Sequence, residues 1–201
     1  MELNELKLRF TLQQLVDDHL LISAPLSSNA SKKLRKAAVL IAIVNHEDGL
    51  HLLLTQRPLH LRAHPGQISF PGGKVEKTDK NPIDTALREA EEEIGLLASN
   101  VDVLGLFPAH NTFTGFEITP IIGLVKSPFT PVLDPGEVAD CFTVPLTFFM
   151  DANNRHQKQF LRAGRQHTVF FIPYKQRFIW GATAAMIDLL CRHLSATEHK
   201  R

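Results

Sequence analysis

The sequence predicts one α/β domain, an α/β/α sandwich with a mixed β-sheet between helices. Three observations lead to this prediction. The chain has 201 residues, 44% of them hydrophobic, which is enough for one well-packed core. Short apolar runs typical of strands occur together with segments whose apolar residues recur at helical spacing. Finally, the sequence has no internal repeat and no apolar run long enough for a membrane span.

The amino-terminal part predicts a helix and a linker. Between Met1 and Leu21, Leu3, Leu6 and Phe10 recur at the spacing of an amphipathic helix. The same stretch lacks the charged region and apolar core of a secretory signal. Serines gather at 27–31, so we expect residues 1–31 to be a helix and linker packed on a single domain formed by residues 32–201. The helix could serve its own core or a partner subunit, and a homodimer is therefore possible. The basic residues of 32–36 are typical of a solvated flank.

The remaining elements follow from pattern and turn residues. Strands are predicted at 37–44 and 50–55, joined in a hairpin by His46-Glu47-Asp48-Gly49. Further strands are expected at 101–106, 118–125 and 167–172, and a short helix at 147–152. A last helix at 181–194 should close the fold.

A helix between Asn81 and Gly95 is the clearest local prediction. Asn81 is a good N-cap, Pro82 suits the first helical position, and Asp84 places negative charge near the helix start. Gly95 favours a helix end. At about 100° per residue, the helix has an apolar stripe of Ile83, Leu87, Ala90 and Ile94, roughly opposite an acidic arc of Glu89, Glu92 and Glu93.

The acidic arc has two interpretations. A solvated helix face is the more common one for an acidic run. However, no basic residue lies between Arg88 and Ser99, so the glutamates lack the following Lys or Arg that would support such a face. Carboxylates at this spacing repel one another unless a divalent cation joins them. Hard oxygen ligands of this kind suit Mg²⁺ or Mn²⁺.

The segment Arg88-Glu89-Ala90-Glu91-Glu92-Glu93-Ile94-Gly95-Leu96 resembles the second half of the Nudix box, Arg-Glu-U-X-Glu-Glu-X-Gly-U, where U is a bulky apolar residue. The first half departs from the pattern. Asp79 stands where the family has a Glu, and the interval from Asp79 to Arg88 is one residue longer. The family's Glu braces the loop against the Arg, and the sequence alone leaves open whether Asp79 does so.

A second motif precedes the box. Residues 53–73 read Leu-Leu-Thr-Gln-Arg-Pro-Leu-His-Leu-Arg-Ala-His-Pro-Gly-Gln-Ile-Ser-Phe-Pro-Gly-Gly. This segment is similar to the signature of coenzyme A pyrophosphatases within the Nudix superfamily, Leu-Leu-Thr-X-Arg-(Ser/Ala)-X3-Arg-X3-Gly-X3-Phe-Pro-Gly-Gly. Every fixed position matches except Pro58, where the family prefers Ser or Ala.

The resemblance implies a Nudix-type α/β/α sandwich and a metal-dependent hydrolase. Coenzyme A or a derivative would be cut at its diphosphate to 4′-phosphopantetheine and adenosine 3′,5′-bisphosphate. Glu89, Glu92 and Glu93 would be the catalytic metal ligands, with Glu89 a possible general base. The carbonyl of Gly72 would be a further ligand. An acid from outside the box is often used in the family, and here Glu137 is the candidate, with an ordinary turn residue as the equal alternative.

The coenzyme A signature also suggests substrate contacts. Arg57 and Arg62 would bind phosphate oxygens, because guanidinium groups hold such oxyanions bidentately. Gly72 and Gly73 would let the backbone approach the substrate closely. His64 could contact a phosphate or cap the turn at 65–66. The aromatic residues Phe113, Phe116, Tyr174 and Trp180 could form a wall against the base or the pantetheine arm, although core packing is the simpler interpretation for Trp180.

Composition narrows the remaining classes. A formal charge of +1 argues against a general nucleic-acid binder, and the sequence suggests no membrane partner. Cys141 and Cys191 lack metal-site spacing and fit reduced core thiols of a cytoplasmic protein. His110, His156 and His167 are scattered, so they favour structural or surface roles over a second metal site. Two alternatives stay open: a Nudix pyrophosphatase for another nucleoside diphosphate derivative, and a catalytically weak module that binds a nucleotide.

Overall fold

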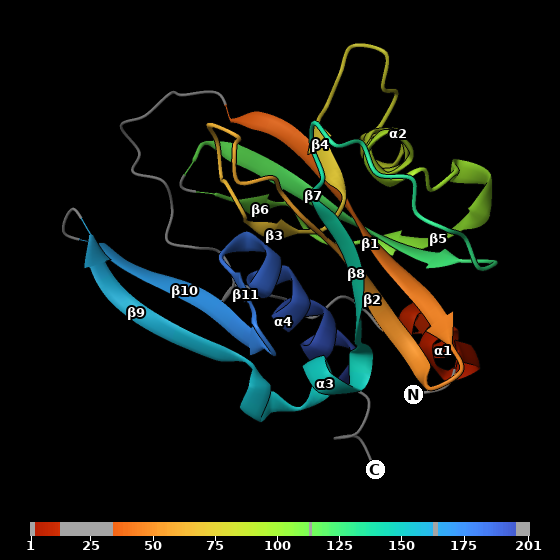
Figure 1. Ribbon diagram of the computed structural model, residues 1–201. Coiled ribbons are helices and arrows are strands. Elements are labelled where there is room, and N and C mark those ends of the chain that lie inside the picture. Colours follow the sequence, from red (N-terminus) through yellow and green to blue (C-terminus); the bar gives the residue numbers. More distant parts are fainter. Residues whose placement is uncertain (1–2, 13–33, 113, 163–164, 196–201) are drawn as a thin grey trace.

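The computed structural model describes residues 3–12, 34–112, 114–162 and 165–195 (Figure 1). These residues form an eight-stranded main sheet of β1 (Arg35–His46), β2 (Gly49–Gln56), β3 (Ile68–Ser69), β4 (Gly72–Lys74), β5 (Val101–Leu106), β6 (His110–Asn111), β7 (Phe116–Val125) and β8 (Asp140–Pro145). A three-stranded sheet contains β9 (His156–Arg162), β10 (Arg165–Tyr174) and β11 (Arg177–Trp180). The helices are α1 (Leu3–Leu12), α2 (Pro82–Ile94), α3 (Leu146–Met150) and α4 (Ala182–Ser195), with 3₁₀ turns at Ala98–Asn100 and Ala152–Asn154.

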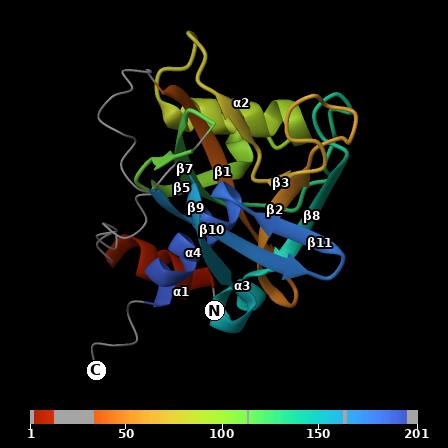
Figure 2. The ribbon, with the colours of Figure 1, turned by 90° about the vertical axis from the view of Figure 1, so that its left-hand side faces the viewer.

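The main sheet is mixed, as the sequence predicts. Its central order is β3-β2-β1-β7-β5, with β4 paired to β1, β6 to β7 and β8 to β2. β1 and β7 run parallel, whereas the other pairs are antiparallel. β1 and β2 form the predicted hairpin, whose turn lies between His46 and Gly49. The second sheet is antiparallel throughout and lies beside β3 (Figure 2).

Helices cover both faces of the main sheet, so the predicted α/β/α sandwich is confirmed (Figures 1 and 2). α2 packs on one face, and α1, α3 and α4 lie on the other. β1 is buried on both sides: Leu40 faces α2, while Val39 and Ile41 face the opposite core. Ala86 and Ala90 of α2 are fully buried against this sheet. Small side chains there let the helix lie close to the strands.

Several sequence predictions need correction or extension. The basic flank predicted at 32–36 is covered only from residue 34: Arg35 and Lys36 are exposed, as expected, but they already belong to β1. The Arg35 guanidinium lies 3.9 Å from the Phe116 ring centroid. The strands β3, β4 and β6 were not predicted, because two or three residues are too few to show alternation. β8, β9 and β11 were not predicted either.

The amino-terminal prediction is only partly covered by the structure. α1 spans Leu3–Leu12, while the rest of the predicted helix and the serine segment 27–31 lie outside the described residues. Leu6 is fully buried, and the Phe10 ring lies 5.7 Å from that of Phe107 and 4.9 Å from that of His193, between ring centroids. Cys191 is buried as expected, whereas Cys141 is only half-buried. Within the described ranges, no helix has the length and apolar character needed to cross a membrane.

The packing of α1 can be tested with two leucines on opposite sides of the same helix. We expect Leu6→Ala to lower the free energy of unfolding by about 2–5 kcal/mol, because it leaves a cavity in the core. Leu8 is 57% exposed, so Leu8→Ala should change it by less than about 0.5 kcal/mol. Urea unfolding of both variants measures the difference. Equal, small effects would show that α1 does not contribute to the core in solution.

Candidate active site

α2 carries most of the predicted site, and its ends form as the sequence predicts. The Asn81 side-chain oxygen accepts hydrogen bonds from the backbone N–H groups of Ile83 (2.8 Å) and Asp84 (3.1 Å). Gly95 ends the helix in the left-handed conformation, with φ of 70°. With both ends set, the apolar stripe faces the sheet and orients the acidic arc.

Three carboxylates meet beside this helix. Glu89 and Glu93 of α2 and Glu137 from the loop before β8 each offer an oxygen, and these atoms all lie within 4.8 Å of one another. Glu93 is buried, the Glu89 side chain is 13% exposed, and Glu137 is exposed. We call this group the carboxylate cluster. It brings together two residues of the predicted box and the candidate acid from outside it.

Backbone hydrogen bonds bring Glu137 to the helix. The N–H of Val132 donates to the carbonyl of Ile94, and the N–H of Asp134 donates to the carbonyl of Glu93, both at 3.0 Å. These bonds satisfy carbonyls at the end of α2, which have no partner within the helix. The Asp134 side chain accepts from the N–H of Gly136 at 2.8 Å, so Glu137 follows a tight turn. The two interpretations of Glu137 are therefore compatible, because this residue both follows a turn and belongs to the cluster.

Burial and mutual repulsion make the cluster costly to ionise. Burial, together with the carboxylates of Glu89 and Glu137, raises the pKa of Glu93 to about 8, although the Gly72 N–H and Arg57 act in the opposite direction. Burial also raises the pKa of Glu89, against the lowering effect of Arg88. Closely spaced carboxylates with raised pKa values suit a divalent cation, which supplies the missing positive charge. The residues present therefore fit a hard cation such as Mg²⁺ or Mn²⁺.

The two glycines of the loop have different spatial constraints. The Gly72 N–H points to the Glu93 carboxylate, with a nitrogen–oxygen distance of 3.4 Å. Gly72 is also paired with Val39 in the sheet, and a Cβ there would overlap the backbone of β1. A Cβ at Gly73 would overlap the carboxylate of Glu89. Only glycine at these positions lets the loop lie directly against the cluster.

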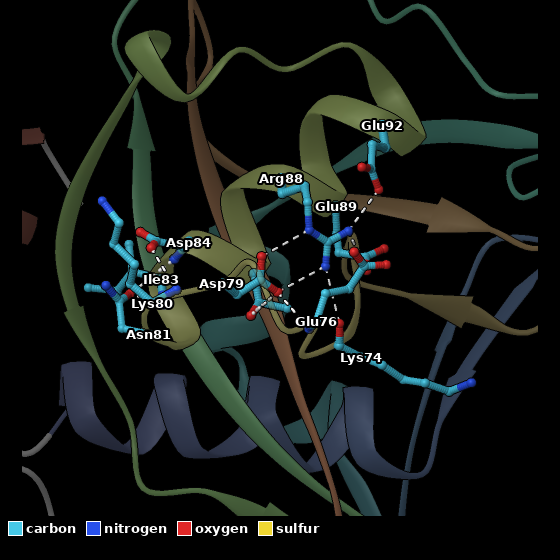
Figure 3. A network of polar contacts seen from close by, with 11 residues as sticks. Lys74, Glu76, Asp79, Lys80, Asn81, Ile83, Asp84, Arg88, Glu89 and Glu92 are labelled. Carbon is cyan, nitrogen blue, oxygen red and sulfur yellow. Dashed lines mark hydrogen bonds and ion pairs between the residues drawn. The ribbon is translucent and has the colours of Figure 1, made fainter.

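Arg88 joins this loop to the helix (Figure 3). Its Nε and Nη2 atoms each donate to the Asp79 carboxylate at 3.1 Å, and Nη2 also donates to the carbonyl of Lys74 at 3.1 Å. Asp79 accepts further hydrogen bonds from the Thr85 hydroxyl and the Glu76 N–H, both at 2.8 Å. The Arg88 guanidinium, together with the Glu76 N–H, holds the pKa of Asp79 well below its usual range. Asp79 thus braces the loop, which answers the question that the sequence left open.

Glu92 lies apart from the cluster. Its side chain is 59% exposed and pairs with Arg88 Nη1 at 2.8 Å, while the same atom lies 3.0 Å from Glu89. No basic residue follows the glutamates in the helix, but Arg88 precedes them and supplies the ion pair. The geometry places Glu92 at the rim of the site and Glu137 at its centre.

The predicted phosphate-binding residues follow β2. Arg57 is half-buried and close enough to Glu93 to lower the pKa of that carboxyl. Arg62 and His64 are exposed in the following loop, and His64 has a left-handed backbone, with φ of 55°. That conformation and the hydrogen bond from the Gln67 N–H to the His64 carbonyl, at 3.2 Å, place His64 in a turn. Arg57 is therefore the member of this group that the structure brings to the carboxylate cluster.

Comparison with known proteins agrees with this geometry. The family model of the NUDIX domain matches residues 34–163. The chain belongs to the Nudix hydrolase family. An uncharacterized Nudix hydrolase NudL from Pectobacterium atrosepticum is 40% identical over 161 residues, covering 80% of this chain and 83% of that protein. The namesake from Escherichia coli K12 is 42% identical over 153 residues, covering 76% and 79%.

A solved structure supports the Nudix fold. The MutT protein from Methanosarcina mazei matches with a TM-score of 0.53 and 19% identity, covering 86% of this chain and 99% of that chain. At this identity the likeness concerns the fold alone. Nudix hydrolases act with divalent metal ions on diphosphate bonds of nucleoside diphosphate derivatives. In this chain, the oxygen atoms of the carboxylate cluster are ligands of the kind that such a divalent cation needs.

The brace between Asp79 and Arg88 should stabilise the Nudix fold measurably. We expect Asp79→Asn to lower the free energy of unfolding by about 2–4 kcal/mol, because it leaves Arg88 without its buried partner. The lowered pKa means that this stabilisation is complete above pH 4 and is lost as the pH falls through the folded-state value. Denaturant unfolding at several pH values measures both effects.

Asp84→Asn is the matched control for the brace. Asp84 accepts a hydrogen bond from the Lys80 N–H at 3.1 Å, and an asparagine oxygen can keep that bond. Its expected cost is below about 1 kcal/mol. If Asp79→Asn costs no more than this control, Asp79 does not brace the loop.

The effect of metal on thermal stability should distinguish Glu89 and Glu93 of the cluster from Glu92 at its rim. We expect Mg²⁺ or Mn²⁺ to raise the Tm of the wild type, because a cation bound only to the folded state stabilises it. Glu89→Gln and Glu93→Gln should remove this rise, whereas Glu92→Gln should retain most of it. Thermal unfolding with and without metal measures the shifts. Equal loss in all three variants would restore Glu92 to the ligand set.

Proposed function

We propose that this Nudix hydrolase cleaves the diphosphate of coenzyme A or a derivative, giving 4′-phosphopantetheine and adenosine 3′,5′-bisphosphate. The observation that carries this proposal is the coenzyme A signature at residues 53–73, which ends in Gly72 and Gly73 against the carboxylate cluster. Within this segment, Arg57 lies near Glu93. Through Arg57, the signature therefore provides a cationic group near the position proposed for the diphosphate.

Within this proposal, Glu89, Glu93 and Glu137 would hold the cation, with the carbonyl of Gly72 as a further ligand. When bound, Mg²⁺ or Mn²⁺ would supply positive charge that activates water and neutralises the diphosphate oxygens. The oxygen of water forms a bond to one phosphorus, and the bond from that phosphorus to the bridging oxygen breaks. No covalent enzyme intermediate is needed.

The side chains have separate roles. Glu89 is the proposed general base, because its carboxylate belongs to the cluster that would hold the cation and the attacking water. Arg57 and Arg62 are the proposed diphosphate contacts, since guanidinium groups bind phosphate oxygens in pairs. Arg88 acts as a positioning residue, because it holds the loop through Asp79 and also reaches Glu89.

A catalytically weak nucleotide-binding module has little support. That alternative depended on Asp79 and the extra loop residue, yet Asp79 binds Arg88 through both carboxylate oxygens. A Nudix pyrophosphatase for another nucleoside diphosphate derivative has Pro58 in its favour, where the coenzyme A signature prefers Ser or Ala. The substrate must therefore be decided by experiment.

The substrate prediction calls for a side-by-side assay. We expect purified protein with Mg²⁺ or Mn²⁺ to release 4′-phosphopantetheine from coenzyme A in preference to products from 3′-dephospho-coenzyme A, ADP-ribose, NADH and 8-oxo-dGTP. Mass spectrometry identifies the products. Preferential cleavage of another compound would discard coenzyme A, while absence of cleavage with either metal would favour a binding module.

Variants link any activity to the cluster. Glu89→Gln and Glu93→Gln should each lower kcat by about 100-fold or more, because they remove charge that holds the cation. Glu91→Gln is the control, since Glu91 is exposed on the same helix and outside the cluster. Full turnover by Glu89→Gln and Glu93→Gln in excess metal would contradict the proposed site.

A further inference from the structure

A cleft that contains none of the carboxylate cluster lies at the hairpin of β10 and β11. This cleft has a volume of about 590 Å³, within the range of small-molecule sites. We call it the hairpin cleft, and its lining includes Gln56, Gly66, Phe142, Lys175, Phe178 and Trp180. Its walls therefore come from the end of β2, the signature loop, β8 and the hairpin.

The hairpin presents aromatic rings that the core does not use. Phe178 is 54% exposed and Trp180 is 44% exposed, whereas Ile179 between them is fully buried. Because side chains alternate along a strand, Phe178 and Trp180 share the face that is turned away from the core. The expectation that Trp180 packs in the core is therefore wrong. Tyr174 also lines the cleft, while Phe113 lies outside the described residues.

Arg177 makes the cleft rigid. Its guanidinium lies 3.7 Å from the Phe142 ring centroid, donates to Asp140 at 2.6 Å and donates to Gln56 at 3.1 Å. These contacts attach the hairpin to the ends of β2 and β8. Arg177 is 30% exposed, so its flat guanidinium remains partly open.

Lys175 supplies positive charge at the turn of the hairpin. It is exposed, its Nζ lies 5.2 Å from the Tyr174 ring centroid, and it forms no ion pair with any residue that the structure describes. Its backbone is left-handed, with φ of 52°. The cleft thus has exposed flat rings and one cation without an acidic partner among the described residues, a combination that matches a nucleotide better than an aliphatic chain.

The cleft and the carboxylate cluster are linked through consecutive residues at the end of β2. Gln56 lines the cleft, and the next residue, Arg57, lies near Glu93. The hairpin itself follows residue 163, where the match to the Nudix domain ends. Because Arg177 ties it to the end of β2, the hairpin is well placed to affect which diphosphate compound is accepted.

We propose that the hairpin cleft binds the adenosine 3′-phosphate half of coenzyme A, with the adenine against Trp180 and Phe178 and the 3′-phosphate at Lys175. This inference rests on the proposed function, because it assigns one half of that substrate. The diphosphate then lies at Arg57, and the pantetheine arm leaves in another direction.

Fluorescence tests the assignment without catalysis, because Trp180 is the only tryptophan in the chain. Metal-free protein is titrated with adenosine 3′,5′-bisphosphate and, separately, with 4′-phosphopantetheine. We expect the adenosine compound to quench Trp180 and the pantetheine compound to leave it unchanged. Quenching by 4′-phosphopantetheine alone, or by neither compound, overturns the assignment even if coenzyme A is hydrolysed. Quenching without hydrolysis would instead discard the proposed reaction and leave the cleft assigned.

Calorimetry on variants tests the proposed adenine contact of Trp180 and the proposed phosphate contact of Lys175 independently. Trp180→Ala should raise the Kd for adenosine 3′,5′-bisphosphate about tenfold, and Trp180→Phe should restore most of the affinity. Lys175→Gly removes the charge at a position whose backbone suits glycine, so the turn should stay folded. This variant should lower the preference for adenosine 3′,5′-bisphosphate over adenosine 5′-phosphate about fivefold. Unchanged affinities in Trp180→Ala and Lys175→Gly would overturn the proposal.

Discussion

The ion pair between Arg88 and Asp79 holds the parts of the active site in register. Asp79 belongs to the loop after β4, whereas Arg88 belongs to the helix that carries the glutamates. The Asp79 side chain is 4% exposed, so leaving either partner alone would place an uncompensated charge in a poorly hydrated site. The same guanidinium donates to the carbonyl of Lys74, directly after the two glycines. The close approach of Gly73 to Glu89 depends on this connection.

The carboxylate cluster, in contrast, destabilises the folded protein. Glu93 is buried beside two other carboxyl groups, and only Arg57 and the Gly72 N–H oppose the rise of its pKa. A protein selected for stability alone would place an apolar residue there. The fold supplies the means to tolerate the cluster, because α2 is held at both ends and its alanines pack closely on the sheet. Destabilisation is thus concentrated at the place where a cation can relieve it.

Sequence reasoning worked best where the determinants are local. Asn81, Pro82 and Gly95 mark the ends of α2, and each acts through residues next to it in the chain. The role of Glu137 could not be derived in this way, because it depends on a hydrogen bond from Asp134 to the carbonyl of Glu93, far away in the sequence. The contact between Asp79 and Arg88 could not be predicted either. Whether Asp79 reaches Arg88 across a loop that is one residue longer depends on the path of that loop. Trp180 was misassigned because β11 was not recognised, and without the strand there is no alternation to place the ring.

The carboxylate cluster and the hairpin cleft are built from different parts of the chain. The carboxylate cluster lies within residues 34–163, which match the Nudix domain, whereas the hairpin follows them. Arg177 ties the hairpin to Asp140 and Gln56, so the hairpin is attached to the ends of β8 and β2. A cleft held in this way loses little conformational freedom when a ligand enters. Under the proposed function, specificity can change at the hairpin while the carboxylates of the cluster stay where they are.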